Sequence, residues 1–453
     1  MQYVLFSTFM DEETGRLILP YQTVATLVNV NAHSHGFSAS KWLDTFSVEV
    51  MPLDVSQYAY AEGQARTITP QIAPDILDAL RAERTRDDDG GKVWFDTGIP
   101  VSRRNLKANR DEYEQYLLSL SLDINSCHPA HPLIQYLLRQ PQDTLQKVLN
   151  QNWPLVKEAV YALPMDSPRQ QKTRLWCERV VDNLETFRHI YYTDSLKTPR
   201  IFAAGANIHQ LPRALRRLAF AGETECDLRA CQLAVVARLW DIPELQEFLD
   251  SGESIWSELL AWVGMPPTCK PIIKRTVYSI VFCMGRKNLT AQLANGDTQD
   301  AGIGTDAAQR FFRHPLMNSL LKARGRQQKA VWEADGCKDA WGNWIKASWD
   351  VARKKKDVPS VLACSVQSYE LRIMMSILPI LESEPQVSLL SWLHDGCTIH
   401  FGNITKQARQ EERMQAAVRR EADMLGMATW LEVEHLPTLA QVVRANPTLR
   451  LAV

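Results

Sequence analysis

Residues 270–293 read KPIIKRTVYSIVFCMGRKNLTAQL, and this stretch constrains the fold more than any other part of the chain. Lys270, Lys274, Tyr278 and Phe282 recur every four residues. On a helix they lie along one face, with about 40° of drift at each step. The apolar residues on the neighbouring surface are Ile273, Val277, Ile280 and Val281. The pattern predicts a helix that buries one side and presents two cations followed by two aromatic rings.

Such a stripe suits a nucleoside triphosphate, because ammonium groups pair with phosphates and aromatic rings pack on base and sugar. The same pattern also fits a helix with two core aromatics and two lysines whose aliphatic stems lie along its surface. The stripe alone leaves both interpretations open.

From Lys274 onward the string resembles the nucleotide-binding fingers helix of the family A DNA polymerases, the bacterial DNA polymerase I-like enzymes. That pattern runs Lys, three residues, aromatic, three residues, Tyr-Gly. The similarity continues in step through Leu289, Gln292 and Leu293. The resemblance implies that Lys270 and Lys274 bind the triphosphate and that Tyr278 and Phe282 pack on the nascent base pair.

Composition sets wide limits. The chain has 453 residues, of which 45% are hydrophobic and 23% charged, which is typical of a soluble protein with two to four subdomains. The formal net charge of −1 indicates no general affinity for nucleic acid, so any such surface has to be local. Nine cysteines without a CxxC pair favour a reduced, cytoplasmic setting. We expect no membrane contact, because the sequence shows no signal peptide and no apolar run of about 18 residues.

Residues 1–105 are predicted to form a small N-terminal module of unknown role, with β-like runs at 3–6, 17–19 and 23–30. Within it, Asp11, Glu12 and Glu13 resemble the first motif of DnaQ-like exonucleases. The further carboxylates that such enzymes need are missing from this span, so a charged turn is favoured. Residues 106–195 show helical periodicity and are predicted to be a thumb-like helical subdomain.

Residues 198–212, TPRIFAAGANIHQLP, resemble a family segment that begins Thr-Gly-Arg-Leu and ends Asn-Leu-Gln-Asn-Ile-Pro. The resemblance implies that Arg200, Asn207 and Gln210 contact the minor groove of the primer-template. Arginine and amide groups can reach the groove acceptors that all correct base pairs share. The alternative is that these are loop residues that bind their own backbone. The cations that follow, Arg213, Arg216 and Arg217, predict a basic patch for phosphates.

Two aspartates are candidates for metal binding. Asp227 lies in CDLRACQLAV, which resembles the family pattern of Asp, four residues, Glu-Leu, and this implies metal binding by Asp227 and the carbonyl of Leu228. Asp395 lies in VSLLSWLHDGCTIHFG, where two apolar runs flank a tight turn and predict a hairpin with Asp395 at its tip. This segment resembles the family signature His-Asp-Glu. The resemblance places His394 at the primer end and Asp395 on the metal.

The sequence 366–369, Val-Gln-Ser-Tyr, resembles the family's Met-Gln-Gly-Thr and implies that Gln367 contacts the primer-template. Residues 311–315 resemble its Tyr-Phe-x-x-x-Pro helix. The basic run 353–356, RKKK, is interpreted as a solvated face with at most phosphate contact. All these motifs follow the family order from Thr198 to Gly402.

The chain departs from the family pattern at four places. Lys270 replaces an arginine and gives up bidentate phosphate geometry. Phe282 and Cys283 replace Tyr-Gly, and Gly396 replaces the glutamate after the second aspartate.

The fourth departure concerns the sugar. Gln232 stands where the family has a glutamate that crowds the sugar 2′ position, which predicts altered selection between dNTPs and rNTPs. The Tyr278 hydroxyl is expected to substitute for a missing 3′-OH, so that dideoxynucleotides are accepted.

The resulting prediction is an α+β, mostly helical protein with the right-hand polymerase fold. It places an antiparallel palm sheet at 196–260 and 363–453, helical fingers at 261–362, and the helical thumb and N-terminal module as above. The predicted activity is template-directed DNA synthesis without proofreading. Asp227, Leu228 and Asp395 would hold two Mg²⁺ ions, with Mn²⁺ as an alternative, and Lys274 would protonate the leaving pyrophosphate.

The expected partners are primer-template nucleic acid and nucleoside triphosphates, in plasmid or phage replication or repair, with the oligomeric state open. Two alternatives remain. Single-subunit RNA polymerases share His394-Asp395 and Lys274 to Val277, which leaves primase-like or other RNA synthesis open. A non-catalytic polymerase fold that binds nucleic acid is the other, although retention of both aspartates and Lys274 favours catalysis.

Overall fold

The structure is a computed structural model, and it describes residues 117–445 except 141, 167, 187–188, 196–197, 206, 297–300 and 351–354. It also describes 114–115 and six two-residue strands between residues 19 and 101. The chain divides into two units. The first comprises Met1–Ser119, Ala159–Arg188 and Gly205–Leu211, and the second Leu120–Glu158, His189–Ala204 and Pro212–Val453.

The first unit contains helix α8 (Pro168–Thr186) and the short 3-10 helix η1 (Ile208–Gln210), which contact each other. Among the residues that the structure describes, its N-terminal part contains three antiparallel strand pairs. They are β1 (Leu19–Pro20) with β3 (Thr67–Ile68), β2 (Leu53–Asp54) with β4 (Gln71–Ile72), and β5 (Val93–Trp94) with β6 (Pro100–Val101). The predicted runs at 3–6 and 23–30 and the acidic string at 11–13 lie outside the described residues.

The second unit is built on a four-stranded antiparallel sheet of order β14-β15-β9-β16. Its strands are β9 (Thr224–Leu228), β14 (Val387–Leu393), β15 (Gly396–Phe401) and β16 (Leu431–His435). The predicted hairpin is confirmed, because β14 and β15 pair and Asp395 lies in the turn between them.

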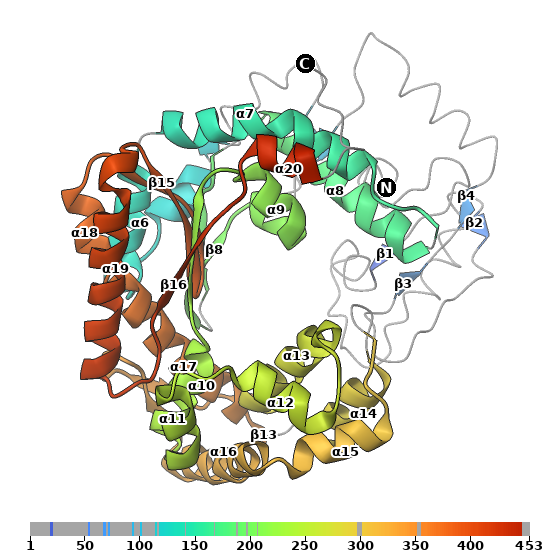
Figure 1. Cartoon of the computed structure of the whole chain (residues 1–453), viewed down its shortest axis with the longest axis vertical. Coiled ribbons are helices and arrows are strands. Elements are labelled where there is room, and N and C mark those ends of the chain that lie inside the picture. The colour runs from blue at the N-terminus through green and yellow to red at the C-terminus, as the bar shows by residue number, and fades with distance from the viewer. Residues whose placement is uncertain are drawn as a thin grey trace. The chain divides into compact units, whose positions relative to one another are not determined.

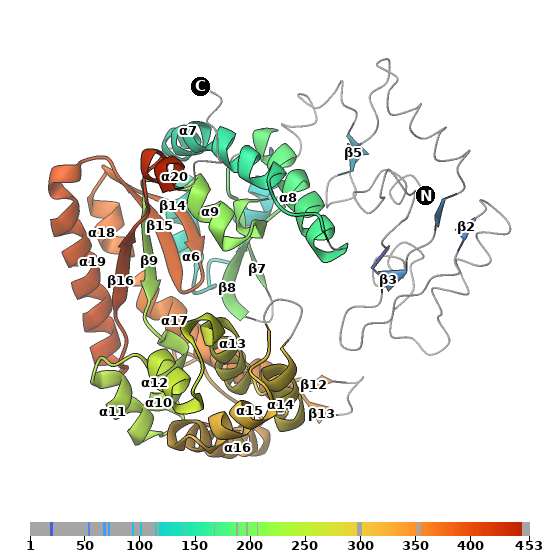
Figure 2. The same ribbon diagram turned by 45° about the vertical axis from the view of Figure 1, so that its right-hand side comes forward.

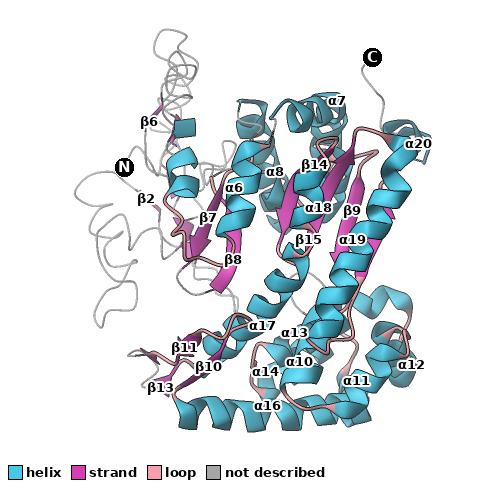
Figure 3. Cartoon of the chain, turned by 90° about the vertical axis from the view of Figure 1, so that its left-hand side faces the viewer, coloured by secondary structure: helices cyan, strands magenta, loops and turns pink. Residues whose placement is uncertain are grey.

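Strand β9 shows why the sheet has one polar face. Its sequence TECDL alternates, so that Thr224, Cys226 and Leu228 are buried while Glu225 and Asp227 point to the opposite side. Helices α18 (Leu378–Ser383) and α19 (Ile404–Met424) run along one side of the sheet (Figure 3). Helix α9 (Arg213–Ala219) lies on the other side (Figure 1).

A helical part lies beyond one end of this sheet (Figure 2). Its helices are α10 (Cys231–Leu239), α11 (Pro243–Asp250), α12 (Ile255–Val263), η2 (Pro267–Cys269), α13 (Lys270–Val281), α14 (Arg286–Asn295), α15 (Thr305–Arg313), α16 (Pro315–Ala334) and α17 (Val358–Met375). Between α16 and α17 the chain forms two ribbons, β10 (Gly336–Lys338) with β11 (Trp344–Lys346) and β12 (Trp349–Asp350) with β13 (Lys355–Lys356).

The remaining elements are α6 (His131–Arg139), α7 (Gln142–Tyr161), β7 (Tyr192–Ser195), β8 (Thr198–Ala203) and α20 (Leu439–Ala445). The predicted α+β, mostly helical class with an antiparallel sheet is confirmed. The assignment of palm, fingers and thumb, with their boundaries, stays a prediction.

Helix α17 is the central helix of the second unit. It contacts α10, α16, α19, β8 and β10. The stretch Val358–Ser383 is long and apolar enough to cross a bilayer by length and composition alone, but 61% of its most apolar window is buried inside the structure. The sequence prediction missed this run because Glu370 and Arg372 interrupt it. Its burial is that of a core helix.

The predicted helix over 270–293 is interrupted. Helix α13 ends at Val281, and α14 begins at Arg286. Between them Cys283 has a φ of 64°, and the amide of Met284 donates to the carbonyl of Ser279 over 2.9 Å. This is the closing pattern of a helix that ends in the left-handed conformation. The stripe from Lys270 to Tyr278 therefore lies on one helix, whereas Phe282 caps its end.

Candidate active site

Strand pairing brings the two predicted metal-binding aspartates to one end of the sheet. Asp227 in β9 lies opposite Gly396 of β15 and opposite Glu432 of β16. The carbonyl of Asp395 accepts a hydrogen bond from the amide of Leu228 over 2.9 Å, so the hairpin turn is tied to the end of β9. Burial and the nearby Asp395 carboxylate raise the pKa of Asp227 to about 7, against the opposing effect of Lys274. Two carboxylates are therefore crowded into a place that destabilises negative charge.

Gly396 is required by the close approach of β9. A Cβ atom at this position would lie 2.8 Å from the carbonyl oxygen of Cys226 and 3.3 Å from Oδ1 of Asp227. This close contact explains why position 396 holds a glycine and not the glutamate of the pattern that the sequence resembles. The carboxylate beside Asp227 is instead Glu432, whose side chain is 54% exposed and lies 3.6 Å from Arg229. Sequence reasoning missed Glu432, because the register of β16 on β9 could not be derived.

Helix α13 directs its stripe toward the aspartates. Lys274 Nζ lies 5.6 Å from the ring centre of Tyr278 and 5.8 Å from that of Trp256, and the two rings pack edge to face. Burial, Asp395 and Asp227 together raise the pKa of Tyr278 well above its usual range. Lys274 thus favours the ionised form of Asp227, and both carboxylates act on Tyr278. Lys270, one turn earlier, is exposed, and Phe282 is half-buried.

A buried polar network lies beside the aspartates and centres on Glu370 of α17. This side chain is fully buried and accepts hydrogen bonds from Arg200 Nε over 2.9 Å and Arg200 Nη2 over 2.5 Å. Gln232 Nε2 donates to its other oxygen over 3.0 Å. Burial, reinforced by Asp395, raises the pKa of Glu370 to about 7 in spite of the Arg200 cation. The network connects β8, α10 and α17.

Glu370 has no counterpart among the predicted site residues. Its sequence signal is a single acidic residue within the apolar helix VPSVLACSVQSYELRIMM. A buried carboxylate requires a cationic or hydrogen-bonding partner, but its partner Arg200 lies 170 residues away. The guanidinium that was predicted to read the minor groove is therefore held by Glu370. The Oε1 atom of Gln232 is buried and has no hydrogen-bond partner among the described residues.

His394 precedes Asp395 in a strained backbone conformation with a φ of 55°. Its ring packs edge to face on Phe202 at 5.1 Å, and its Nδ1 atom is buried without a hydrogen-bond partner in the described part of the chain. Burial and Arg200 lower the pKa of His394 to about 4, so the imidazole is neutral at pH 7. Nearby, Gln367 accepts a hydrogen bond from the hydroxyl of Thr198.

The predicted groove residues Asn207 and Gln210 belong to the first unit and bind local backbone. Asn207 accepts from the amide of His209 over 3.0 Å, and both side-chain amides donate to the carbonyl of Gly205. The alternative of a self-bonded loop is thus observed, and the contact with nucleic acid stays a prediction.

The basic patch predicted at residues 213–217 is engaged with carboxylates of the sheet. Arg213 pairs with Glu225 over 3.1 Å, and Arg217 pairs with Glu225 and Glu434. Both arginines are thus paired with the acidic face of the sheet, and their contact with phosphates stays a prediction.

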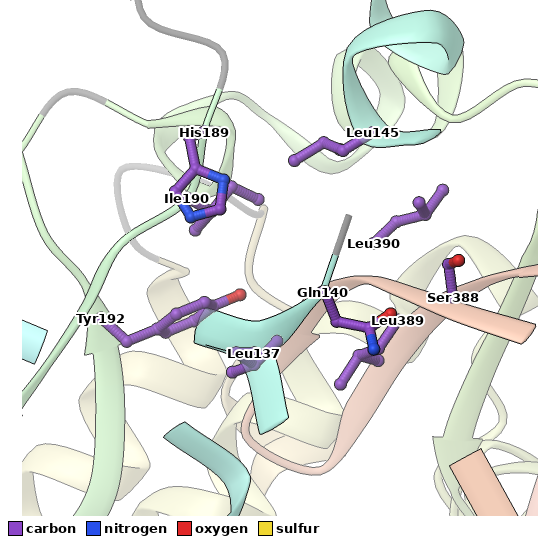
Figure 4. A pocket seen from close by; sticks show the side chains of 9 residues that line it. All are labelled: Leu137, Gln140, Leu145, His189, Ile190, Tyr192, Ser388, Leu389 and Leu390. Carbon is purple, nitrogen blue, oxygen red and sulfur yellow. The ribbon is translucent and has the colours of Figure 1, made fainter. Parts of the chain in front are cut away.

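A pocket lies away from the predicted site residues. It is lined by Leu137, Gln140, Leu145, His189, Ile190, Tyr192, Ser388, Leu389 and Leu390, and Figure 4 shows these side chains around a mainly apolar space. Burial lowers the pKa of His189 to about 4, so the ring is neutral at pH 7. No predicted catalytic residue contributes to this pocket.

The donor set at the aspartates is small. In the described part of the chain, no three His, Cys, Asp or Glu side chains form a group that could hold a metal ion. A cation bound here would therefore depend on Asp227, Asp395 and backbone carbonyls, together with water or substrate oxygens.

Comparisons with known proteins do not identify the family of this chain. No protein-family model matches the chain, and no curated protein matches it. One similar solved structure is the POL domain of Pol1 from M. smegmatis in complex with DNA primer-template and dNTP. It matches 80% of this chain and 72% of its own at 14% sequence identity, with a TM-score of 0.46. A likeness of that extent is too low to support a function.

Proposed function

We propose that the chain is a DNA polymerase that transfers nucleotides under the direction of a template, with a two-metal mechanism. The observation that carries the proposal is the meeting of Asp227, at the end of β9, with Asp395, in the turn before β15. Lys274 of α13 acts on Asp227, and both carboxylates act on Tyr278 of the same helix. The order of the sequence motifs, which resembles that of the family A enzymes, implies the same grouping.

The residues fit divalent cations of the hard type. Asp227 has a raised pKa because like charge and burial disfavour its ionised form, which a bound cation would relieve. Two carboxylates and a backbone carbonyl are oxygen ligands that suit Mg²⁺, which keeps several waters and binds substrate phosphates. Asp227, Asp395 and the carbonyl of Leu228 would hold two Mg²⁺ ions, or Mn²⁺. When bound, such ions supply Lewis-acid stabilisation of the attacking and leaving oxygens.

The side chains of α13 would bind the incoming nucleotide. Lys274 would neutralise the phosphates and donate a proton to the leaving pyrophosphate, while exposed Lys270 would meet the outer phosphate. Tyr278 and Phe282 would pack on the nascent pair. Neutral His394 would direct its unpartnered Nδ1 toward the primer end.

The network around Glu370 would set the geometry of the duplex and the sugar. Arg200 and Gln367 would contact the minor groove, with Arg200 oriented by the carboxylate of Glu370. Gln232 would face the sugar and be held by the same carboxylate. Substitution Gln232→Glu would place a second carboxylate against Glu370, so it tests electrostatic repulsion as well as sugar selection. Glu370→Gln is a second variant, which retains the shape, removes the charge and replaces one acceptor oxygen by an amide donor.

The test is extension of a labelled primer on a DNA template with Mg²⁺, run separately with dNTPs and rNTPs. We expect extension with dNTPs, unusual acceptance of rNTPs and ready incorporation of dideoxynucleotides. The Asp395→Ala variant should be inactive, while the variant of an exposed aspartate, Asp250→Ala, should be active.

The other outcomes separate the alternatives. Extension only with rNTPs would show that the chain synthesises RNA. RNA synthesis is the second candidate because Gln232 replaces a glutamate that would crowd the sugar 2′ position. Tight duplex binding without extension by either nucleotide set would indicate a non-catalytic nucleic-acid-binding protein. Strong rejection of dideoxynucleotides would contradict the role of the Tyr278 hydroxyl, and equal sugar preference in Glu370→Gln and wild type would contradict the role of the network.

A further inference from the structure

Four of the thirteen tryptophans lie between residues 332 and 349, within the end of α16 and the two ribbons that follow it. All four are exposed: Trp332 by 43%, Trp341 by 38%, Trp344 by 53% and Trp349 by 58%. Figure 3 shows β10, β11 and β13 gathered beside α16 and α17. A concentration of exposed aromatic rings on one segment marks a surface that binds something.

The hairpin β10-β11 has an apolar inner face. Cys337 and Ile345 are paired across the strands and pack on the cluster of Val331, Ala347, Val358, Val361 and Leu362. Because side chains alternate along a strand, the neighbouring residues Lys338, Trp344 and Lys346 share the outer face. Lys338 lies directly opposite Trp344, and both lysines are exposed.

The indole of Trp344 lies on Gly336. A Cβ atom at Gly336 would stand 2.7 Å from Nε1 and 3.0 Å from Cε2 of this ring. The glycine thus provides the space in which the indole rests against the strand. One side of the ring is supported by backbone, and Trp344 remains 53% exposed on a hairpin face that it shares with Lys338 and Lys346.

The hairpin is also held firmly on α17. Ser365 donates to the carbonyl of Lys338 over 3.0 Å, and Arg372 donates to the carbonyl of Ala340 over 2.7 Å. The amide of Ala340 donates to the hydroxyl of Ser368 over 2.8 Å. These bonds fix the position of the outer face, which lowers the ordering cost of binding.

Two of the nearby carboxylates, those of Asp339 and Asp335, have hydrogen-bonding or ionic partners. Asp339 accepts hydrogen bonds from the amides of Trp341 and Asn343 within the hairpin turn. Asp335 pairs with Lys356 over 2.9 Å, and Lys356 also lies 5.4 Å from the ring centre of Trp332. In the second ribbon Trp349 is paired with Lys356 across the strands, but the ammonium group of Lys356 is engaged by Asp335 and by the carbonyl of Trp332.

We propose that this surface, defined by Trp344, Lys338 and Lys346, binds single-stranded nucleic acid. Exposed rings stack on unpaired bases, and the lysines beside them pair with phosphates, which is the combination that strand-binding surfaces use. A duplex has no free base faces to offer, so the surface favours single strands. The inference goes beyond the proposed activity and does not depend on it, because it concerns binding without nucleotide transfer.

The test measures binding of a fluorescent single-stranded probe of about 20 nucleotides, long enough for one strand-binding site, and of a matched duplex to the full-length protein. The buffer contains EDTA, so that metal-dependent binding at the aspartates does not contribute. We expect Trp344→Ala to weaken binding of the single strand by about five- to a hundredfold, the range for one stacked base. The double variant K338A/K346A should reduce the slope of log affinity against log salt by roughly 1.4, at about 0.7 for each phosphate contact.

The control is Trp262→Ala, which removes a comparably exposed tryptophan from α12. It should bind like wild type, and circular dichroism should show that all variants are folded. The effect of Trp344→Ala should persist in the Asp395→Ala background, which separates this inference from the proposed activity. Photocrosslinking of a strand that carries bromodeoxyuridine should label the peptide that contains Trp344.

Unchanged binding of the single strand by both variants would overturn the proposal. Equal loss of single-strand and duplex binding would also overturn it, because base stacking would then not be the cause. If sedimentation showed a dimer that Trp344→Ala dissociates, with no change in binding of the probe, the surface would be an interface between copies of the chain.

Discussion

Replacement of Asp227 by asparagine should stabilise the protein at alkaline pH. The pKa of Asp227 is raised from 3.8 to about 7 because the carboxylate is buried and faces Asp395. As pH rises through this window, the unfolded chain releases the proton before the folded protein does. Stability therefore falls with rising pH between about 4 and 7 and is level above that range.

The magnitude follows from the size of the pKa change. A tenfold change in the acid dissociation constant is worth about 1.4 kcal/mol, so the ionised form of Asp227 costs roughly 2–4 kcal/mol of folding free energy above pH 7. Asp227→Asn removes this cost but retains a side chain of the same size. We expect a gain of that order at about pH 8 and a much smaller difference at about pH 4.5.

The assay is urea unfolding in EDTA at both pH values, followed by circular dichroism, with the exposed Asp250→Asn as the matched control. Mg²⁺ added at about a hundredfold excess over its dissociation constant should stabilise wild type by about 2.7 kcal/mol and the variant by much less. If Asp227→Asn destabilised the protein equally at both pH values, and Mg²⁺ had no effect on wild type, the reasoning from charge crowding would be refuted.

Three further changes probe the surroundings of the aspartates. Arg200→Ala leaves the buried carboxylate of Glu370 without its cation and should cost about 3–5 kcal/mol in urea unfolding, whereas loss of an exposed pair such as Lys329 with Glu333 should cost less than about 1 kcal/mol. Gly396→Ala forces a Cβ against Cys226 and Asp227 and should cost about 1–3 kcal/mol, with primer extension reduced at least about tenfold; unaltered extension would count against the close packing. Lys274→Ala should lower the rate of nucleotide addition by about a hundredfold or more with partial recovery in Lys274→Arg, while the exposed Lys287→Ala should match wild type in single-turnover kinetics.

The local parts of the fold could be predicted from the sequence because their signals are local. Two apolar runs around His394-Asp395-Gly396 predict a hairpin, and the structure has it. The break of the helix after Val281 was not predicted, since the periodic pattern continues across it. The left-handed conformation of Cys283 that ends the helix falls on a residue type that gives no signal for it.

That the site residues lie close together could be predicted only from the order of the motifs along the chain. The meeting of Asp227 with Asp395 depends on the pairing of β9 with β15, and no periodicity within either strand specifies that pairing. Glu370 was missed for a related reason, since its partner Arg200 is distant in sequence and a lone glutamate in an apolar helix does not reveal which cation it meets. The register that places Glu432 beside Asp227 is likewise a long-range property.

Single-nucleotide addition on four templates that differ only in the first unpaired base tests the proposed chemistry most directly. Each template is offered each of the four dNTPs separately with Mg²⁺, and pyrophosphate release is measured together with primer length. We predict one addition and one pyrophosphate for the complementary nucleotide on each template, and none in Asp395→Ala. Addition that ignores the template base, addition that survives in Asp395→Ala, or no addition at all would contradict the assignment of Asp227 and Asp395 as the centre of a template-directed nucleotidyl transferase.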